Sequence, residues 1–252
     1  MNKYLKNLEK IEFIVTYACT GRCIHCSEGD HTSCGSHIDP TVASAAVKSI
    51  ASAYNIRTVM TFGGEPLLYP ESVYAVMNTA NELGIPTRQV ITNGFFSKDR
   101  EKIKEVTSRL AECGVNDLLL SADAFHQEHI PLDTVRGFAL EAKSAGIPVR
   151  IQPAWLVSRE DGNRYNLKTK DILHEFASLG IESNEGNIIF PEGNAKRYLS
   201  EFFADHIPQN PYVEDPRDVR CLSVDPDGCV LDGNIYDEDI SDIAKRYKPY
   251  GI

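Results

Sequence analysis

The sequence predicts an α/β fold: a partial (β/α)6 TIM-like barrel with a small C-terminal β-hairpin extension. From Glu12 to Phe190, short β-rich runs alternate with segments of helical apolar spacing. There are six such runs, whereas a closed barrel needs eight. Several helical segments end at a glycine, as in Leu83-Gly84 and Cys113-Gly114, which is typical of a helix C-terminus before a strand.

The predicted strands span residues 12–17, 57–62, 87–92, 115–121, 148–152 and 181–190. The helices predicted between them span residues 40–54, 71–83, 98–113, 132–145 and 168–179. Because a helix separates successive strands, we expect a mostly parallel sheet with right-handed crossovers. The chemistry of such a barrel lies at the carboxyl ends of its strands.

The pattern changes after residue 190. Residues 195–204 predict a helix, and the Pro-rich, polar residues 207–218 predict a linker. Residues 221–224 and 229–231 flank the turn sequence Asp225-Pro226-Asp227-Gly228, which predicts a β-hairpin followed by a short acidic tail. We therefore divide the chain into a barrel domain, residues 1–190, and an extension, residues 191–252.

Composition limits the class of protein. The chain has 252 residues, of which 42% are hydrophobic and 25% charged, as in globular domains. It shows neither a signal peptide nor the roughly 18-residue apolar run of a membrane span. Seven cysteines without an export signal indicate metal ligation in a reducing compartment, so we expect a cytoplasmic protein. A net charge of −10 argues against indiscriminate nucleic-acid binding.

Cys19, Cys23 and Cys26 lie on one short loop directly after the first predicted strand. Three thiolates at this spacing can close on one soft metal centre. A structural zinc ion normally takes four protein ligands, whereas a reactive centre keeps one position open. A [4Fe-4S] cluster held by three cysteines would leave one iron for a substrate or cofactor. A zinc-binding or unliganded cysteine loop is the alternative.

A second motif, Gly63-Gly64-Glu65-Pro66, follows the second predicted strand. Two glycines at a strand end let a ligand approach the backbone closely, and Glu65 offers an acceptor for an ammonium group. The C-x3-C-x2-C loop and the GGE motif, in this order and each at a strand end, resemble the signatures of the radical S-adenosylmethionine (SAM) superfamily. The partial barrel is also the fold that this resemblance implies.

The resemblance implies that SAM chelates the free iron of a cluster held by Cys19, Cys23 and Cys26, and that its amino group is bound by Gly63, Gly64 and Glu65. An electron donor such as flavodoxin or ferredoxin would reduce the cluster. SAM would then be cleaved to methionine and a 5′-deoxyadenosyl radical, which takes a hydrogen atom from a small-molecule or peptide substrate. The alternative from another class is a non-catalytic Fe-S or zinc protein, in which Glu65 has no role.

Other polar residues are expected near SAM or the substrate. His25 stands where the family usually has an aromatic residue, and we expect it beside the adenine. Thr92-Asn93-Gly94 resembles a triplet common in the family, and Ser121 and Asp123 resemble its S-x-D pattern. Gln152 is a polar residue at the end of an apolar strand. These four strand-end residues could instead form turns or helix caps.

The remaining histidines and cysteines leave alternatives open. Asp123, His126 and His129 suggest a second metal site, but substrate binding or proton transfer by His126 is the favoured hypothesis. Cys34 and Cys113 are expected to be structural.

The segment after Cys221 resembles a degenerate SPASM/twitch extension, because the family's next cysteine is replaced near Asp232, which should face Cys221 across the hairpin. We expect a cluster-free cap on the barrel's open edge. An auxiliary cluster built from Cys221, Cys229 and a distant cysteine is the alternative.

Overall fold

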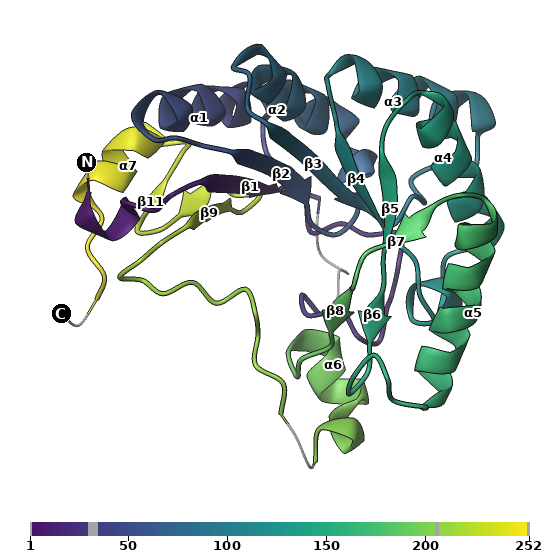
Figure 1. The fold of residues 1–252 in the computed structure, drawn as a ribbon. Helices are drawn as coiled ribbons and strands as arrows, with labels where there is room; N and C mark the ends of the chain where they lie inside the picture. Colours follow the sequence, from purple (N-terminus) through teal and green to yellow (C-terminus); the bar gives the residue numbers. More distant parts are fainter. Residues whose placement is uncertain (1, 30–34, 205–206, 251–252) are drawn as a thin grey trace.

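A curved, fully parallel sheet forms the centre of the computed structural model, which describes residues 2–29, 35–204 and 207–250. Its seven strands follow the order β7-β5-β4-β3-β2-β1-β9. Helices α1 to α5 lie along the convex side of the sheet (Figure 1). This arrangement confirms the predicted partial barrel.

Five predicted strands and five predicted helices are confirmed within a few residues. The strands are β1 Lys10–Ile14, β2 Thr58–Phe62, β3 Thr87–Thr92, β4 Asp117–Ser121 and β5 Val149–Gln152. The helices are α1 Pro40–Ala53, α2 Pro70–Glu82, α3 Arg100–Glu112, α4 Leu132–Ser144 and α5 Arg164–Ser178. Short 3-10 helices occur at η1 Lys3–Leu5, η2 Pro66–Leu68, η3 His126–Glu128 and η4 Ser200–Phe203.

Local chemistry sets the helix ends. Asp39 and Asp99 accept hydrogen bonds from the first backbone amides of α1 and α3, as N-cap residues do. Gly84 and Gly114 follow α2 and α3 with φ of 68° and 79°, in the left-handed region that glycine adopts without strain. The glycine stops predicted from the sequence are therefore real.

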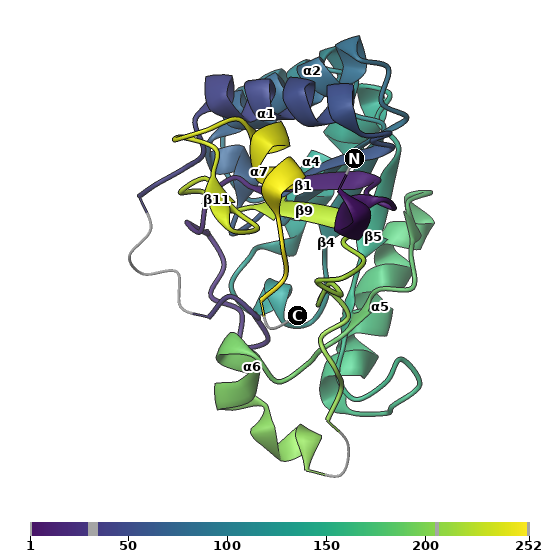
Figure 2. The same cartoon turned by 90° about the vertical axis from the view of Figure 1, so that its left-hand side faces the viewer.

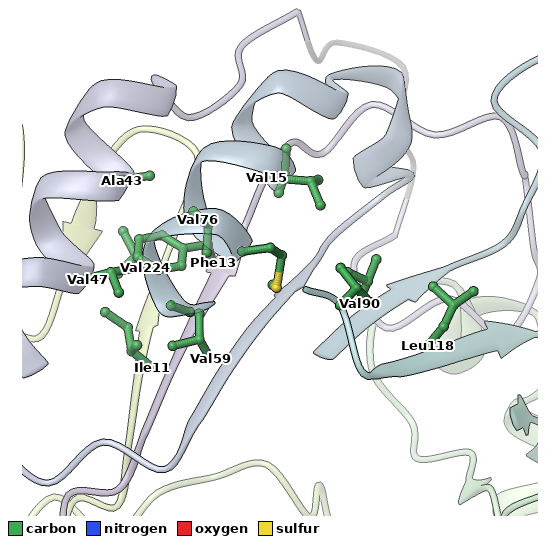
Figure 3. Close-up of a cluster of buried hydrophobic side chains, with 14 of the residues drawn as sticks. Ile11, Phe13, Val15, Ala43, Val47, Val59, Val76, Val90, Leu118 and Val224 are labelled. Atoms are coloured by element: carbon green, nitrogen blue, oxygen red, sulfur yellow. The ribbon is translucent and has the colours of Figure 1, made fainter. Parts of the chain in front are cut away.

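The main core lies between the sheet and the helices. Ile11, Phe13 and Val59 point from β1 and β2 toward Val47 of α1 and Val76 of α2 (Figure 3). The alternate residues of β1, Lys10, Glu12 and Ile14, are only half-buried. Since side chains alternate across a strand, these residues line the concave side, on which the described part of the chain forms no helix layer.

The sixth predicted strand is broken into two short pieces, β7 Glu182–Ser183 and β8 Asn187–Ile188. Gly186 separates them with φ of 76°, and a Cβ there would lie 2.3 Å from the Pro153 carbonyl oxygen. β7 stays in the main sheet, while β8 pairs with β6 Ala154–Trp155, which follows β5. The β6–β8 pair continues beyond the carboxyl ends of β5 and β7 (Figure 1).

The predicted pairing of residues 221–224 with 229–231 is wrong. β9, Cys221–Val224, joins the main sheet parallel to β1, with Cys221 opposite Lys10 and not Asp232 (Figure 2). The C-terminal hairpin instead pairs β10 Cys229–Val230 with β11 Gly233–Asn234. Pairing with β1 buries Leu222 and Val224 completely in the main core. This apolar burial favours the main sheet over the local hairpin. The Asp225–Gly228 turn forms as predicted, with the Gly228 amide donating to the Asp225 carbonyl at 3.0 Å.

Two further expectations for the extension need correction. The acidic tail contains helix α7, Ile240–Arg246, whose Ile240 and Ile243 are buried against the main core. The helix expected at residues 195–204 is split into α6, Gly193–Tyr198, and η4. No helix among the described residues is long and apolar enough to cross a membrane.

The division at residue 190 stays a prediction, and β9 gives a way to test it. We expect Leu222→Ala to lower the free energy of unfolding of the whole chain by about 2–5 kcal/mol, because it leaves a cavity in the shared core. Trp155, the one tryptophan of the sequence and 1% exposed, reports on the opposite part of the fold by fluorescence during urea unfolding. Val213→Ala, 75% exposed, is the control. An unshifted Trp155 transition in Leu222→Ala would mean that the two parts unfold independently.

Candidate functional site

The cysteine loop follows β1 at the carboxyl edge of the sheet, as predicted. A Cβ built on Gly21 would lie 3.3 Å from the Cys23 sulfur and 3.6 Å from the Cys19 sulfur, so both sulfurs border one small space. Cys26 interacts electrostatically with both. Burial raises the pKa of Cys19 to about 11 and raises the pKa of Cys23 further. Gathered, partly desolvated thiols of this kind suit a metal centre, whose charge replaces their protons.

The GGE motif packs directly on this loop. The Gly64 and Glu65 amides donate to the carbonyls of Thr16 and Ala18, each at 2.8 Å. A Cβ on Gly63 would lie 2.5 Å from the Thr16 oxygen, and a Cβ on Gly64 would lie 2.2 Å from the Ala18 oxygen. The close approach predicted for a ligand is therefore made by the chain itself, and the two motifs form one structural unit.

Glu65 is fully buried and ties the end of β2 to the end of β3. Its carboxylate accepts hydrogen bonds from the Leu67 amide at 2.9 Å, the Thr92 hydroxyl at 2.7 Å and the Asn93 amide at 2.8 Å. Burial raises the pKa of Glu65 to about 7, although the three hydrogen bonds act in the opposite direction. Since a carboxylate has about four acceptor positions, roughly one is left for an ammonium group.

Asn93 combines the two roles considered for it. Its side-chain oxygen accepts from the Phe95 amide at 2.8 Å, and Gly94 follows with φ of 71°, which makes a local turn. Its side-chain nitrogen lies 3.2 Å from the Thr20 hydroxyl and 3.6 Å from the Cys19 sulfur. Hydrogen bonds to the sulfurs of an Fe-S centre help to set its reduction potential.

Asp123 is fully buried at the end of β4, and its two oxygens have four donors. One oxygen accepts from the amides of Phe125 at 2.9 Å and His126 at 3.0 Å. The other accepts from His126 Nδ1 at 2.8 Å and the Ala154 amide at 3.0 Å. Burial alone would raise the pKa of Asp123, but His126 holds it well below its ordinary value. An ionised Asp123 fixes the His126 ring with its proton on Nδ1.

His25 packs beside this pair. Its ring centre lies 4.9 Å from that of Phe125 and 4.8 Å from that of His126. Its Nδ1 is buried without a hydrogen bond to any described residue, and burial lowers the pKa of His25 to about 4. His25 therefore offers a neutral aromatic ring, as packing beside an adenine requires.

The alternative metal site of Asp123, His126 and His129 does not assemble, because His129 is exposed and lies outside the group that contains Asp123 and His126. His25 takes its place in a group whose potential ligand atoms lie within 4.8 Å of one another. The four donors to Asp123 already occupy the acceptor positions that a metal ion would need. We assign no second metal here.

The last two predicted site residues sit side by side on the concave face, where Ser121 is opposite Gln152 in the β4–β5 register. The Gln152 side-chain oxygen accepts a hydrogen bond from Asn184, which follows β7. Ser121 is half-buried. Both lie at the carboxyl edge of the sheet, on the same edge as the cysteine loop.

Below this edge the concave face is first apolar and then charged. Half-buried apolar side chains come first, from the three neighbouring strands: Ile14, Phe62 and Ile91. Deeper in the face, Asp117 accepts from Gln89 at 2.5 Å and from Arg150 at 2.6 Å, and Lys10 pairs with Glu12 at 2.7 Å. A substrate placed here would meet an apolar layer next to the cofactor edge and polar groups beyond it.

The other cysteines stay apart from this edge. Cys221 begins β9 opposite Lys10, at the amino edge of the sheet, and Cys229 is exposed beyond the turn that follows β9. Burial, followed by Glu12, raises the pKa of Cys221. This placement does not bring them together for an auxiliary cluster. Cys113 is buried after α3, as expected, and Cys34 lies outside the described residues.

The sequence pattern did not predict that Asn194 contributes to the site. Residues 191–194 predict only a loop, yet Asn194 is buried against the cysteine loop and donates to the Cys23 carbonyl at 3.1 Å. A buried asparagine usually makes several hydrogen bonds. The available signal in the sequence was therefore an asparagine that follows a glycine directly before a predicted helix.

Comparison with known proteins agrees with this geometry. The model of the Radical SAM superfamily matches residues 13–152, more than half of the chain. A probable GTP 3',8-cyclase of Sulfolobus acidocaldarius is 28% identical over 213 residues, 81% of this chain and 62% of that protein. The GTP 3',8-cyclase of Chlorobaculum tepidum is 27% identical over 127 residues, 50% of this chain and 36% of that protein. The chain thus spans less than two thirds of these relatives.

Solved structures show the same fold at low sequence identity. Streptococcus suis SuiB bound to S-adenosylmethionine matches with a TM-score of 0.64 and 13% identity, over 99% of this chain and 68% of that one. The anSMEcpe structure with bound AdoMet matches with a TM-score of 0.60 and 15% identity, over 94% and 77%. BtrN in complex with AdoMet and 2-DOIA matches with a TM-score of 0.53 and 20% identity, over 95% and 82%.

The contact between the two motifs predicts the effect of Gly64→Ala. The new methyl group would overlap the Ala18 carbonyl, so we expect a loss of about 1–3 kcal/mol in unfolding free energy and a displaced cysteine loop. Thermal unfolding and the iron bound after anaerobic reconstitution measure the two effects. Gly137→Ala in α4, which meets open space, is the matched control and should be neutral or stabilising. Normal iron uptake by Gly64→Ala would contradict the close packing.

Proposed function

Because the chain belongs to the radical SAM superfamily, we propose that it is an enzyme that cleaves S-adenosylmethionine reductively and abstracts a hydrogen atom from a substrate. A [4Fe-4S] cluster and SAM are the cofactors of this superfamily. The observation that carries the proposal is the packing of the GGE motif against the three-cysteine loop. This packing places three thiols, which can hold a cluster with one iron left open, beside the buried carboxylate of Glu65. When bound, the cluster supplies the electron that converts SAM to methionine and a 5′-deoxyadenosyl radical.

The residues of this chain would bind and orient both cofactors. Cys19, Cys23 and Cys26 hold the cluster, and Glu65 accepts a hydrogen bond from the ammonium group of SAM while its other acceptor positions stay anchored to β3. The neutral ring of His25 packs beside the adenine. Ser121 and Gln152 line the same edge and contact SAM or substrate through their polar groups.

The substrate would lie on the concave face, below the cofactor edge. Its reacting C–H group meets the apolar layer of Ile14, Phe62 and Ile91, which excludes water from the radical step. His126, fixed by Asp123 through Nδ1, presents Nε2 for a hydrogen bond to a polar group of the substrate. We propose a small molecule or a peptide as substrate, since the BtrN structure contains 2-DOIA and a second anSMEcpe structure contains the Cp18Cys peptide. A flavodoxin or ferredoxin would supply the electron.

The decisive experiment tests SAM cleavage without knowledge of the substrate. The protein is reconstituted with iron and sulfide under anaerobic conditions, reduced with dithionite and given SAM, and 5′-deoxyadenosine is quantified. We expect product from the wild type and none from the variant with Cys19, Cys23 and Cys26 all changed to Ala. Equal product from both proteins would contradict the proposal, as would a wild-type cluster that neither binds nor cleaves SAM.

Glu65 separates this proposal from a non-catalytic Fe-S or zinc protein. We expect Glu65→Gln to weaken equilibrium binding of SAM about 10-fold or more, because the ammonium group loses a charged partner. The iron content should stay at the wild-type level, since Glu65 does not ligate iron. Glu101→Gln, an exposed residue in the first turn of α3, is the matched control. Unchanged SAM binding in Glu65→Gln would favour the non-catalytic alternative.

A further inference from the structure

The first turn of α6 lies against the cysteine loop, although it belongs to the C-terminal extension. Asn194, 7% exposed, makes three hydrogen bonds to this loop. Its backbone amide donates to the Cys26 carbonyl at 2.8 Å, and its side-chain nitrogen donates to the carbonyls of Cys23 at 3.1 Å and Gly29 at 3.4 Å. A residue about 170 positions away in the sequence thus contacts the backbone of two of the three cysteines.

Gly193 makes this contact sterically possible. Its φ is 49°, and a Cβ at this position would lie 2.3 Å from the Ser27 carbonyl oxygen and 2.6 Å from the Cys26 carbonyl oxygen. Every other residue type would push α6 away from the loop. The Gly193-Asn194 pair is therefore fitted to residues 26–27 of the loop, as Gly63-Gly64 is fitted to the loop's start at residues 16–18.

Between residues 23 and 29, hydrogen bonds also join the backbone of the loop to itself. Its internal bonds are long: the Cys26 amide lies 3.2 Å from the Cys23 carbonyl, and the Gly29 amide lies 3.4 Å from the Cys26 carbonyl. Asn194 supplies a second donor to each of these two carbonyls. Fixing the backbone of a ligand residue restricts the direction of its side chain, and such outer contacts commonly determine how well a metal is held.

We infer that Asn194 is a positioning residue for the cluster: it holds the backbone of Cys23 and Cys26 so that their sulfurs stay placed for iron. This inference rests on the proposed function, because it concerns the same cluster. It also means that the C-terminal extension takes part in cofactor binding and is not merely a cap on the barrel edge.

The anchoring of α6 does not depend on the Asn194 side chain. A second apolar cluster holds this part of the extension, and it includes Ala195, Leu199 and Phe203 of α6 and its continuation, packed with Phe125 and Tyr165. Removing the side-chain donors of Asn194 should therefore leave α6 docked. Truncating Leu199, which is 1% exposed, should lower the stability of this cluster while its remaining members keep α6 and the Asn194 donors in place.

The test uses the full chain, reconstituted anaerobically, and compares Asn194→Ala and Asn194→Asp with Leu199→Ala. The aspartate variant keeps the shape and the backbone amide but has no side-chain donor. Three quantities are measured: the rate at which a chelator removes iron, the EPR spectrum of the reduced cluster, and the melting temperature of the metal-free protein.

We expect both Asn194 variants to lose iron about 10-fold faster than the wild type and to show an altered EPR spectrum. Leu199→Ala should lower the melting temperature more than Asn194→Ala does, yet lose iron within about 2-fold of the wild-type rate. Wild-type iron loss and EPR in both Asn194 variants would overturn the inference. Equally fast iron loss in Leu199→Ala would also overturn it, because general destabilisation would then explain the effect. A wild-type protein that forms no cluster would instead refute the proposed function itself.

Discussion

The packing of the Gly63-Gly64 backbone on residues 16–18 is the contact on which the site depends. No side chain fits between these two segments, and two hydrogen bonds of 2.8 Å hold them together. This contact fixes where the cysteine loop leaves β1. It also places Glu65, the next residue, where it can be buried only by taking donors from Thr92 and Asn93 at the end of β3. Three strand ends are thereby joined through one pair of glycines.

The same logic extends along the carboxyl edge of the sheet. Asp123 accepts hydrogen bonds from two amides of its own turn, from the His126 ring nitrogen and from the Ala154 amide. It therefore joins the end of β4 to β6. Buried carboxylates at this edge are thus satisfied largely by the protein itself. A site built in this way is preorganised, because little rearrangement is needed when charged ligands arrive.

The extension completes the fold at two places that are far apart. β9 covers the edge of β1, which would otherwise expose unpaired backbone groups, and α6 supports the cysteine loop. Between them, Pro211, Tyr212 and Glu214 pass over the concave side and border a cavity of about 240 Å³ with Lys10 and Glu12. The C-terminal extension, which begins beside the cysteine loop, therefore encloses part of the concave face.

Apolar periodicity, glycine stops and ligand spacing predicted the barrel, its first five strands along the chain and the two motifs, because each of these signals lies within a short stretch of sequence. Three features became evident only in the folded chain: the partner of β9, the close packing that requires glycine at positions 63 and 64, and the contact of Asn194 with the cysteine loop. Each of these depends on contacts between residues distant in the chain, and local patterns do not specify them. Leu222 and Val224 give the same alternating sequence pattern in a local hairpin and in a strand of the main sheet. Pairing with the otherwise open edge of β1 selects the main sheet.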